Sequence, residues 1–356
     1  MTPIRSYISP LSTTLFLFVA ILSAGSPAAG ESDRSAKHDS SKESTVLKRI
    51  LANWTARQER VKSFHFVWDR RITVPKEYFA EHRSENGRSE FHDEQFAVRD
   101  DELWVDGNDR IRRDSVKFVP GGPSTVEQSA RDCQVVLGNS EKHLFTTDDP
   151  NALRIGDILS GRELNRLVMF GYANPPMAAY RPFHVRRIID PQTWRVVTFD
   201  AIIGNVHCVK IERRGSEAEF LETCWVDPKR EDVIVERESV LRQDTATTTT
   251  EFKADQRAGW VPIRWTSRSY DRDSVLQMLN ESTVVKYAIN EPISQSTFDL
   301  KFPPRTLVLD DVHNERYLIR NDGTKRLLSK DEVERHRQGK LDYKDLLKPT
   351  DSRSKR

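Results

Sequence analysis

Hydrophobic and polar residues alternate in short runs along much of the chain, which is the pattern of β-strands that bury one face. Phe64, Phe66 and Trp68 occupy every second position of one such run. Between residues 194 and 290 strand-like runs recur about every 10 to 14 residues, which is typical of an antiparallel meander. Further strands are expected, with turns at Asp100-Asp101 and Asp106–Asp109, within residues 89–119, 124–147, 282–289 and 317–328.

Three segments carry helical signals instead. Residues 44–62 begin at an expected N-cap, Ser44, and their apolar stripe falls at i, i+3, i+4 and i+7, on Leu47, Ile50, Leu51 and Trp54. Residues 151–173 have a mixed helical spacing that ends at Asn174-Pro175-Pro176. Ser329, with Glu332 three residues later, predicts a capping box and a short helix near the C-terminus.

The register of the hairpin at 205–227 follows from matching its apolar and ionic pairs. Opposed positions that sum to 432 place Cys208 opposite Cys224. Directly opposed Cβ atoms lie about 4.5–5.5 Å apart, which is near disulfide geometry. The sequence therefore predicts a Cys208–Cys224 disulfide and leaves Cys133 free. Two reduced core cysteines are the alternative, because a slip of one residue would separate them.

A second hairpin, at 247–267, is registered in the same way. Opposed positions that sum to 515 pair Thr250 with Trp265 and Phe252 with Ile263. Both pairs bring large or β-branched side chains together, so this register is expected to hold along the hairpin.

Composition narrows the class of protein. The 356 residues are 37% hydrophobic and 31% charged, against roughly 45–50% and 25% in an average domain, yet they include 7 Trp and 16 Phe. This excludes a polytopic membrane protein, a collagen-like chain and a wholly disordered chain. Lys and Arg number 56 against 54 Asp and Glu, with no basic stripe, so nucleic acid is not expected as a partner.

Residues 1–29 have the pattern of a secretory signal peptide, in which an apolar run of about ten residues precedes a series of small residues. Cleavage is expected near Ala28 or Ala29. The run is shorter than the about 20 residues of a stable membrane span, and an uncleaved tether is the alternative. The polar residues 30–43 and 349–356 are expected to be a disordered linker and tail. The protein is thus expected to be exported, and to be periplasmic or secreted.

Sequence motifs for catalysis and metal binding are absent: there is no nucleophile elbow, P-loop, dinucleotide fingerprint or His-Glu-x-x-His, and the three cysteines form no Cys-x-x-Cys. No catalytic residue, metal ligand or cofactor is therefore predicted. The candidate ligand-binding residues are aromatic residues on predicted strands, namely Phe64, Phe66, Trp68, Trp104, Trp225 and Trp265. They belong either to the core of a large sheet or to an apolar slot that takes acyl chains or an apolar protein segment.

Four short motifs follow one another along the meander: Trp225-Val226-Asp227-Pro228, Gly259-Trp260-Val261-Pro262, residues 289–293 and residues 297–303. With the signal peptide and the first helix, this order resembles the LolA/LolB-like superfamily of periplasmic lipoprotein carriers, over roughly residues 44–310. The resemblance implies an α+β fold, a large curved antiparallel sheet or half-open β-barrel, with helices covering its concave face. It also implies acyl chains bound inside and no catalytic residues.

The function expected from these observations is that of an exported, non-enzymatic protein that binds an apolar ligand, either a lipid or a lipoprotein acyl chain. One alternative is an envelope interaction or sensor module with a filled barrel. The other is a hydrolase of envelope polymers, because a fold does not exclude a grafted site. The expected domain organisation is a half-barrel at 44–310 and a C-terminal hairpin-and-helix extension at 311–348.

Overall fold

The computed structural model describes residues 40–75, 94–119, 128–147, 154–160, 175–183, 193–214, 220–241, 244–338, 340–341 and 346. The predicted signal peptide, its cleavage site and the predicted tail lie outside the described residues. The expected linker lies mostly outside them. Its last four residues, from Ser40, belong to the first helix, which therefore begins four residues before the predicted Ser44 N-cap.

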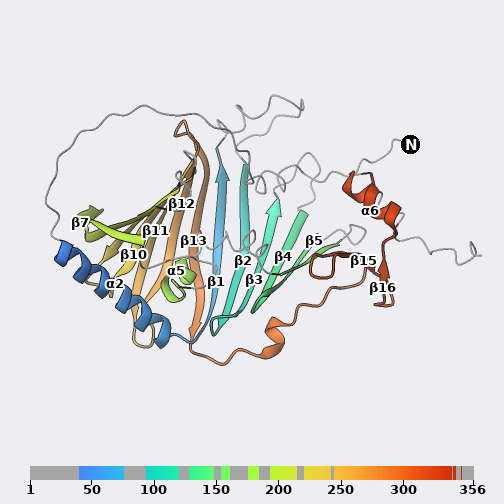
Figure 1. Ribbon diagram of the computed structural model, residues 1–356, viewed down its shortest axis with the longest axis horizontal. Helices are drawn as coiled ribbons and strands as arrows, with labels where there is room; N and C mark the ends of the chain where they lie inside the picture. The colour runs from blue at the N-terminus through green and yellow to red at the C-terminus, as the bar shows by residue number, and fades with distance from the viewer. Residues whose placement is uncertain are drawn as a thin grey trace, which may run out of the picture. The chain divides into compact units, whose positions relative to one another are not determined.

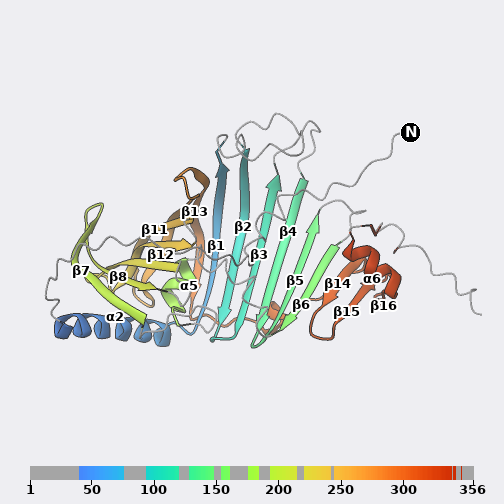
Figure 2. The same ribbon diagram turned by 45° about the horizontal axis from the view of Figure 1, so that its top comes forward.

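In the described residues, sixteen strands form one open sheet, which curls around a short helix (Figures 1 and 2). Its order is β16-β15-β14-β6-β5-β4-β3-β2-β1-β13-β12-β11-β10-β9-β8-β7, and β16 and β7 do not pair with each other. All neighbouring strands are antiparallel except β6 and β14. The fold class is therefore α+β with a large open antiparallel sheet, as the sequence predicts.

In chain order the elements have the following bounds: α2 Ser40–Arg60, β1 Ser63–Val74, β2 Glu94–Asp106, β3 Arg110–Val119, β4 Gln128–Leu137, β5 Ser140–Thr147, β6 Arg154–Ser160, α5 Pro175–Tyr180, β7 Trp194–Ile203, β8 Val206–Arg214, β9 Phe220–Asp227, β10 Val233–Leu241, β11 Asp244–Asp255, β12 Gly259–Tyr270, β13 Leu276–Ile289, η4 Gln295–Phe298, β14 Thr306–Asp310, β15 Glu315–Ile319, β16 Lys325–Leu327 and α6 Lys330–Arg337.

The first helix, α2, packs its apolar stripe onto one face of β7, β8 and β9. Ile50 and Trp54 are buried there against Trp194, Val196 and Ile211, which confirms the predicted stripe. Glu43, in the first turn, accepts a hydrogen bond of 3.0 Å from the backbone N–H of Val196. We call the sheet face that α2 and α5 cover the inner face, and the opposite one the outer face.

The segment predicted as helix over 151–173 contains strand β6, and this prediction is wrong where the structure describes it. Strand β6 lies between β5 and β14, and these two neighbours satisfy its backbone hydrogen bonds. A Cβ added to Gly156 would lie 2.6 Å from the Phe302 ring, so the glycine permits this close packing. Pro175 and Pro176 begin helix α5 instead of ending a helix, because proline suits the first helical turn.

The predicted Cys208–Cys224 disulfide is also wrong. Opposed positions in β8 and β9 sum to 435, with Ile211 facing Cys224, and not to 432. An odd displacement moves one strand's side chains to the other face. Cys224 accordingly packs with Trp54 beneath α2, whereas Cys208 packs with Val233 in another cluster, and none of the three cysteines is in a disulfide.

The second hairpin keeps its predicted register only in part. Thr250 opposes Trp265 as predicted. A bulge between Glu251 and Phe252 then shifts the pairing by one, so that Phe252 opposes Pro262. Proline has no N–H to give to the ladder and is tolerated at such irregularities.

Among the local predictions, the turn at Asp106–Asp109 is confirmed between β2 and β3. Asp100-Asp101 is not a turn, because both residues lie inside β2, at a register shift against β3. The C-terminal hairpin and the Ser329 capping box with Glu332 are confirmed.

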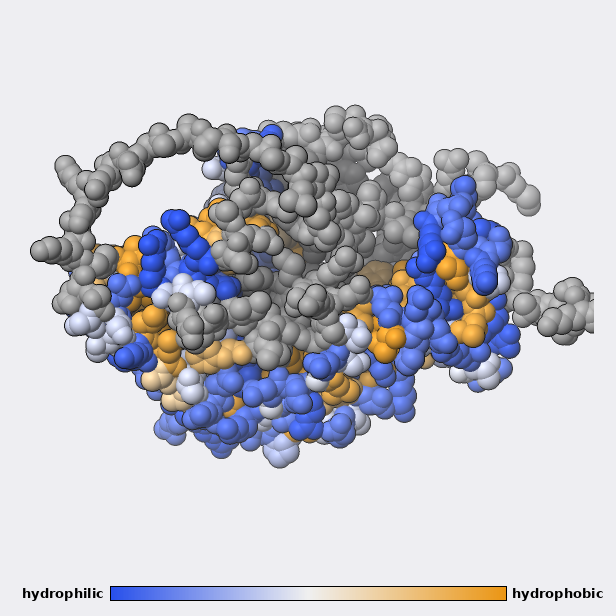
Figure 3. Space-filling model, in the orientation of Figure 1, coloured by the Kyte–Doolittle hydropathy of each residue, from blue (hydrophilic) through white to orange (hydrophobic). Residues whose placement is uncertain are grey.

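Figure 3 shows mainly hydrophilic residues over the described surface on one side of the protein, with smaller hydrophobic patches among them.

Candidate functional site

Four of the six predicted aromatic residues form one apolar surface on the inner face, which we call the apolar floor: Phe64, Phe66 and Trp68 of β1 with Trp265 of β12. Each is at most 3% exposed. The Phe64 and Phe66 ring centroids lie 5.8 Å apart, and those of Trp68 and Trp265 lie 5.5 Å apart. Alternation along β1 places its three aromatic residues on one face, and pairing through β13 brings Trp265 next to them.

Helix α5 covers the floor. Met177, Ala179 and Tyr180 are buried in the same cluster, and the Tyr180 ring centroid lies 5.3 Å from that of Phe64. The Tyr180 hydroxyl donates a hydrogen bond of 3.1 Å to the carbonyl oxygen of Trp260. Burial raises the pKa of Tyr180 well above its ordinary value, so this hydroxyl stays a neutral donor.

A buried arginine holds the end of α5. Arg181 is 1% exposed and donates to four backbone carbonyls, that of its neighbour Tyr180 at 2.6 Å, those of Val61 and Lys62 at 2.7 Å and that of Gly107 at 2.8 Å. Burial lowers its pKa to about 10, which leaves it charged at neutral pH. These carbonyls outside α5 lie in the link between α2 and β1 and in the β2–β3 turn. Arg181 therefore fastens the end of α5 to the edge of the floor.

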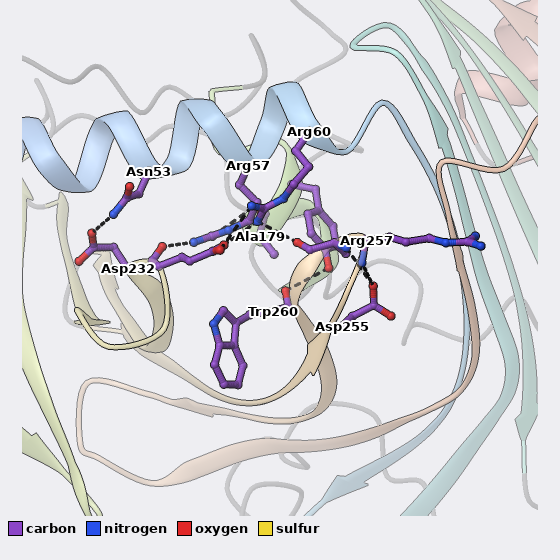
Figure 4. Close-up of polar contacts among 11 residues, drawn as sticks. Asn53, Arg57, Arg60, Ala179, Asp232, Asp255, Arg257 and Trp260 are labelled. Atoms are coloured by element: carbon purple, nitrogen blue, oxygen red, sulfur yellow. Dashed lines mark hydrogen bonds and ion pairs between the residues drawn. The ribbon is translucent and has the colours of Figure 1, made fainter.

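Helix α2 is fastened by a second polar network (Figure 4). Asp232, in the β9–β10 turn, is fully buried and accepts from Arg49 at 2.9 Å and from Asn53 at 2.6 Å. Arg57 donates to the carbonyl oxygen of Ala179 at 3.4 Å and to that of Glu231. Burial lowers the pKa of Arg57 to about 10. The network therefore joins α2, the β9–β10 turn and α5.

The space beside α5 is small. A cavity of about 20 Å³ lies between α5, β10 and β11, which is room for about one water molecule. Its lining combines α5 with the two strands: Pro175, Ala178, Ala179, Ile234, Arg237, Thr248, Thr250 and Phe252. With α5 in place, this cavity is too small for a long ligand.

Beyond the floor, the inner face of β1 to β6 carries what we call the charged row: Arg70, Asp101, Arg113, Asp132, His143 and Asp157. Asp101 is fully buried between Arg70, at 3.0 Å, and Arg113, at 3.2 Å. His143 lies 2.6 Å from Asp132 and 3.2 Å from Asp157. Positive and negative groups thus alternate across six neighbouring strands.

Direct pairing shows that this row and the floor share a face. Trp68 opposes Asp101, and Leu103, which packs with the floor, opposes Arg113. Arg113 in turn opposes Gln134, which opposes His143. Since directly opposed side chains lie on the same side of a sheet, the row continues the inner face.

His143 is held in its charged form. Burial disfavours the imidazolium, but hydrogen bonds to Asp132 and Asp157 outweigh burial and raise the pKa to about 10. Both ring nitrogens then donate, one to each carboxylate. His143 thus lies between two carboxylates as part of a buried ion network.

The remaining two predicted aromatic residues lie on the outer face. Trp104 opposes His65 and is stacked on it, and Trp225 opposes Lys210, whose Nζ lies 5.3 Å from the Trp225 ring centroid. The structure therefore brings together four of the six candidates and separates the other two from them.

Within the described residues, no group of three or more His, Cys, Asp or Glu side chains is placed to hold a metal ion. Burial raises the pKa of the Cys208 thiol to about 11 and that of Cys133 still further, so both remain thiols at neutral pH. Nor is any helix of the described residues both long and apolar enough to cross a membrane.

Sequence reasoning missed the residues that cover and hold the floor. Met177 and Tyr180 follow a Pro-Pro pair that reads as a helix stop, although proline is also frequent at a helix start. The sequence could have indicated that Arg57 is buried, because it lies three residues after Trp54 and therefore on the buried side of α2. Arg181 carries no such pattern, and only the folded chain shows its carbonyl acceptors.

Comparisons with known proteins give no match to any family model or curated sequence. Among solved structures, the chain is similar to an outer membrane lipoprotein-sorting protein domain from Vibrio parahaemolyticus, with 10% identity and a TM-score of 0.41 over 73% of this chain and 97% of that one. It is also similar to a DUF1329 family protein from Desulfovibrio piger, with 7% identity and a TM-score of 0.40 over 71% and 97% of the two chains.

A third solved structure is the lipoprotein LppX from Mycobacterium tuberculosis, with 10% identity and a TM-score of 0.26 over 70% of this chain and 98% of that one. Because all three TM-scores are below 0.5, the function of this chain has to be inferred from its own residues.

Proposed function

We propose that this protein is an exported, non-enzymatic carrier that binds an apolar ligand, a lipid or a lipoprotein acyl chain, on the apolar floor. The observation that carries the proposal is the pairing of four buried aromatic residues with a cover of only six residues, α5. In this proposal α5 moves aside, and the ligand takes the place of Met177 and Tyr180 on the floor.

The energetics allow such an exchange. The polar contacts that hold α5 are single hydrogen bonds from Tyr180 and Arg57 and three from Arg181, and each contributes about 1 kcal/mol or somewhat more. An acyl chain gains about 0.8 kcal/mol for each buried CH₂ group, so about ten groups contribute roughly 8 kcal/mol. Met177 and Tyr180 also lose apolar burial worth about 1.5–3 kcal/mol each when α5 moves, so a ligand that buries more than ten CH₂ groups is needed to offset the contacts that α5 loses.

Export, cleavage near Ala28 or Ala29 and a periplasmic or secreted location belong to the same proposal and are supported by the sequence pattern of residues 1–29. The division of the chain into a half-barrel, 44–310, and an extension, 311–348, is also part of this proposal. In support of that division, β15 and β16 lengthen the sheet only beyond β14.

A second candidate is favoured by the small cavity. A filled inner face is what an envelope interaction or sensor module would have, and the cavity beside α5 holds about one water molecule. In that case the partner would be another envelope protein, and α5 would remain in place.

Uptake of a dansyl-labelled undecanoic acid by the mature protein tests the first candidate. We expect saturable binding with a rise in emission, and faster amide exchange in residues 177–181 when the probe is bound. Trp265→Leu removes part of the floor and is expected to weaken binding by about tenfold.

Trp104→Ala is the matched control, because it removes an aromatic residue from the outer face of the same sheet. Its binding should equal that of the wild type. Equal loss in both variants, or no uptake at all by folded protein, would reject the floor as a binding site and leave the interaction module.

A further inference from the structure

Three flat side chains stack across neighbouring strands on the outer face. His65 of β1 opposes Trp104 of β2, which opposes Arg112 of β3. The His65 and Trp104 rings are parallel to within 5°, with centroids 4.8 Å apart, and Arg112 Cζ lies 5.5 Å from the Trp104 centroid. Arg112 is fixed by Asp114, at 2.7 and 2.9 Å, and by the carbonyl oxygen of Thr297, at 2.7 Å. This stack is therefore held rigidly at its Arg112 end.

The stack stops at β13, where Ala288 opposes His65. A methyl group does not fill the position that a fourth flat side chain would take. A cavity of about 170 Å³ lies there, between the sheet and the segment 291–297. A cavity of about 150 Å³ holds one benzene molecule, so this one has room for a single six-membered ring beside His65.

The lining of this cavity is apolar on one side and polar on the other. Ala288, Pro292 and Ile293 join the two aromatic rings, whereas Glu291, Ser294 and Thr297 are polar, and the Ser294 hydroxyl accepts a hydrogen bond of 3.3 Å from the Ser296 N–H. A purely aromatic ligand would make no hydrogen bonds with the polar residues of the lining. A pyranose sugar has both characters, because its C–H faces stack on aromatic rings and its hydroxyl edges donate to carboxylates.

The electrostatics at His65 fit a neutral ligand. Burial and the positive charge of Lys286 lower the pKa of His65 below its ordinary value, against the opposing effect of Glu291, and the Glu102 carboxylate lies 3.9 Å from His65 Nε2. The imidazole is therefore uncharged at pH 7, with one ring nitrogen as donor and one as acceptor. Glu291, an exposed acidic residue, also lines the cavity.

We propose that this outer-face cavity binds one pyranose sugar ring, which stacks on His65 over Ala288 and donates hydroxyl hydrogen bonds to Glu291. The site is separate from the apolar floor, since it lies on the opposite face of the sheet. The protein would then bind a sugar on one face independently of any apolar ligand on the other.

Saturation-transfer NMR on the full chain tests this with methyl β-D-glucopyranoside, methyl β-D-galactopyranoside, methyl α-D-mannopyranoside and phenol as probes. We expect at least one glycoside to bind with a Kd of about 1 mM, with saturation strongest on the protons of one ring face. Binding of phenol without any glycoside would overturn the proposal in favour of an aromatic ligand. Binding of none of the four would overturn it outright.

Two variants locate the binding. Glu291→Gln should weaken glycoside binding about fivefold, whereas Asp299→Asn, an exposed acid in the same stretch that pairs with Lys301 at 3.5 Å, should not change it. Ala288→Leu fills the fourth place of the stack and removes no polar group, so it should abolish binding. Wild-type affinity in Ala288→Leu, or equal losses in the two acid variants, would place any binding elsewhere.

Discussion

The apolar floor and the charged row occupy the same face of the same sheet, and they solve burial in opposite ways. The floor buries Phe66 and Trp265 with rings against rings, under a helix. The row buries Asp101 completely, with Arg70 and Arg113 on either side of it. Removing water from the first group is favourable in itself, whereas removing it from the second is costly unless each charge keeps its partner.

This difference shows where a ligand could enter. A side chain of the floor can exchange one apolar neighbour for another with little change in free energy, so Tyr180 is replaceable by an acyl chain. A member of the row cannot give up its partner without leaving a buried charge, so Asp101 and His143 keep the β1–β6 half fixed. Some of the many charged residues of this polar chain are therefore buried and stabilise the fold.

The strongest test of this comparison is Asp101→Ala. The substitution leaves Arg70, whose side chain is 13% exposed, without the carboxylate that lies 3.0 Å away. Losing one partner of a buried ion pair costs about 3–5 kcal/mol of unfolding free energy. Urea denaturation of the variant at pH 7 measures the loss.

The control for Asp101→Ala is Asp273→Ala, which removes an acid that is 72% exposed beside Arg272 and should change stability by less than about 0.5 kcal/mol. Replacing the whole group, with Arg70→Met, Asp101→Leu and Arg113→Met, should recover much of the loss, because apolar residues of similar size need no partner. A loss below about 1 kcal/mol in Asp101→Ala would show that the row is not a buried ion network.

Effects of intermediate size are expected from the pH dependence of His143. Its folded pKa, about 10, is higher than the ordinary value of 6.5. Its stabilising contribution is therefore fully present below about pH 6.5 and is lost as the pH rises through about 10. We expect wild type to be more stable than His143→Gln by roughly 1.5–3 kcal/mol of unfolding free energy at pH 6. This difference should shrink at pH 8 and again at pH 10.

His207→Gln serves as the control for His143→Gln. His207 also contacts an acid, Asp200, at 2.6 Å, but both side chains are mostly exposed. Its removal should change stability by less than about 0.5 kcal/mol at every pH. A constant difference between wild type and His143→Gln from pH 6 to 10 would contradict the charged state assigned to His143.

The floor was more predictable from sequence than the row. Phe64, Phe66 and Trp68 alternate within one strand, so their common face follows from a local pattern. The members of the row come one from each of six strands, and polar residues at such positions read as a solvated face. Only the pairing of Arg113 with Leu103 and of His143 with Gln134 places them inside.

The β8–β9 register shows the same limit. Both faces of β9 carry apolar residues, with Leu221 and Trp225 on one and Cys224 and Val226 on the other, so alternation did not decide between the sums 432 and 435. Packing beneath α2 decides it, since Cys224 and Val226 are buried against that helix. Contacts of this kind join residues far apart in the chain, and no local pattern contains them.

The smallest expected effect concerns how the cover is held, and Tyr180→Phe measures it. The change removes only the hydroxyl that donates to the Trp260 carbonyl at 3.1 Å, and it keeps the ring against Phe64. The expected loss is about 1 kcal/mol of unfolding free energy. If α5 is a displaceable cover, the same change should strengthen binding of the fatty-acid probe by up to about fivefold, because opening then costs one hydrogen bond less. Thr55→Val, which removes a hydroxyl from an exposed position of α2, should leave probe binding unchanged. A destabilised Tyr180→Phe protein with wild-type probe affinity would mean that α5 stays in place when the probe binds.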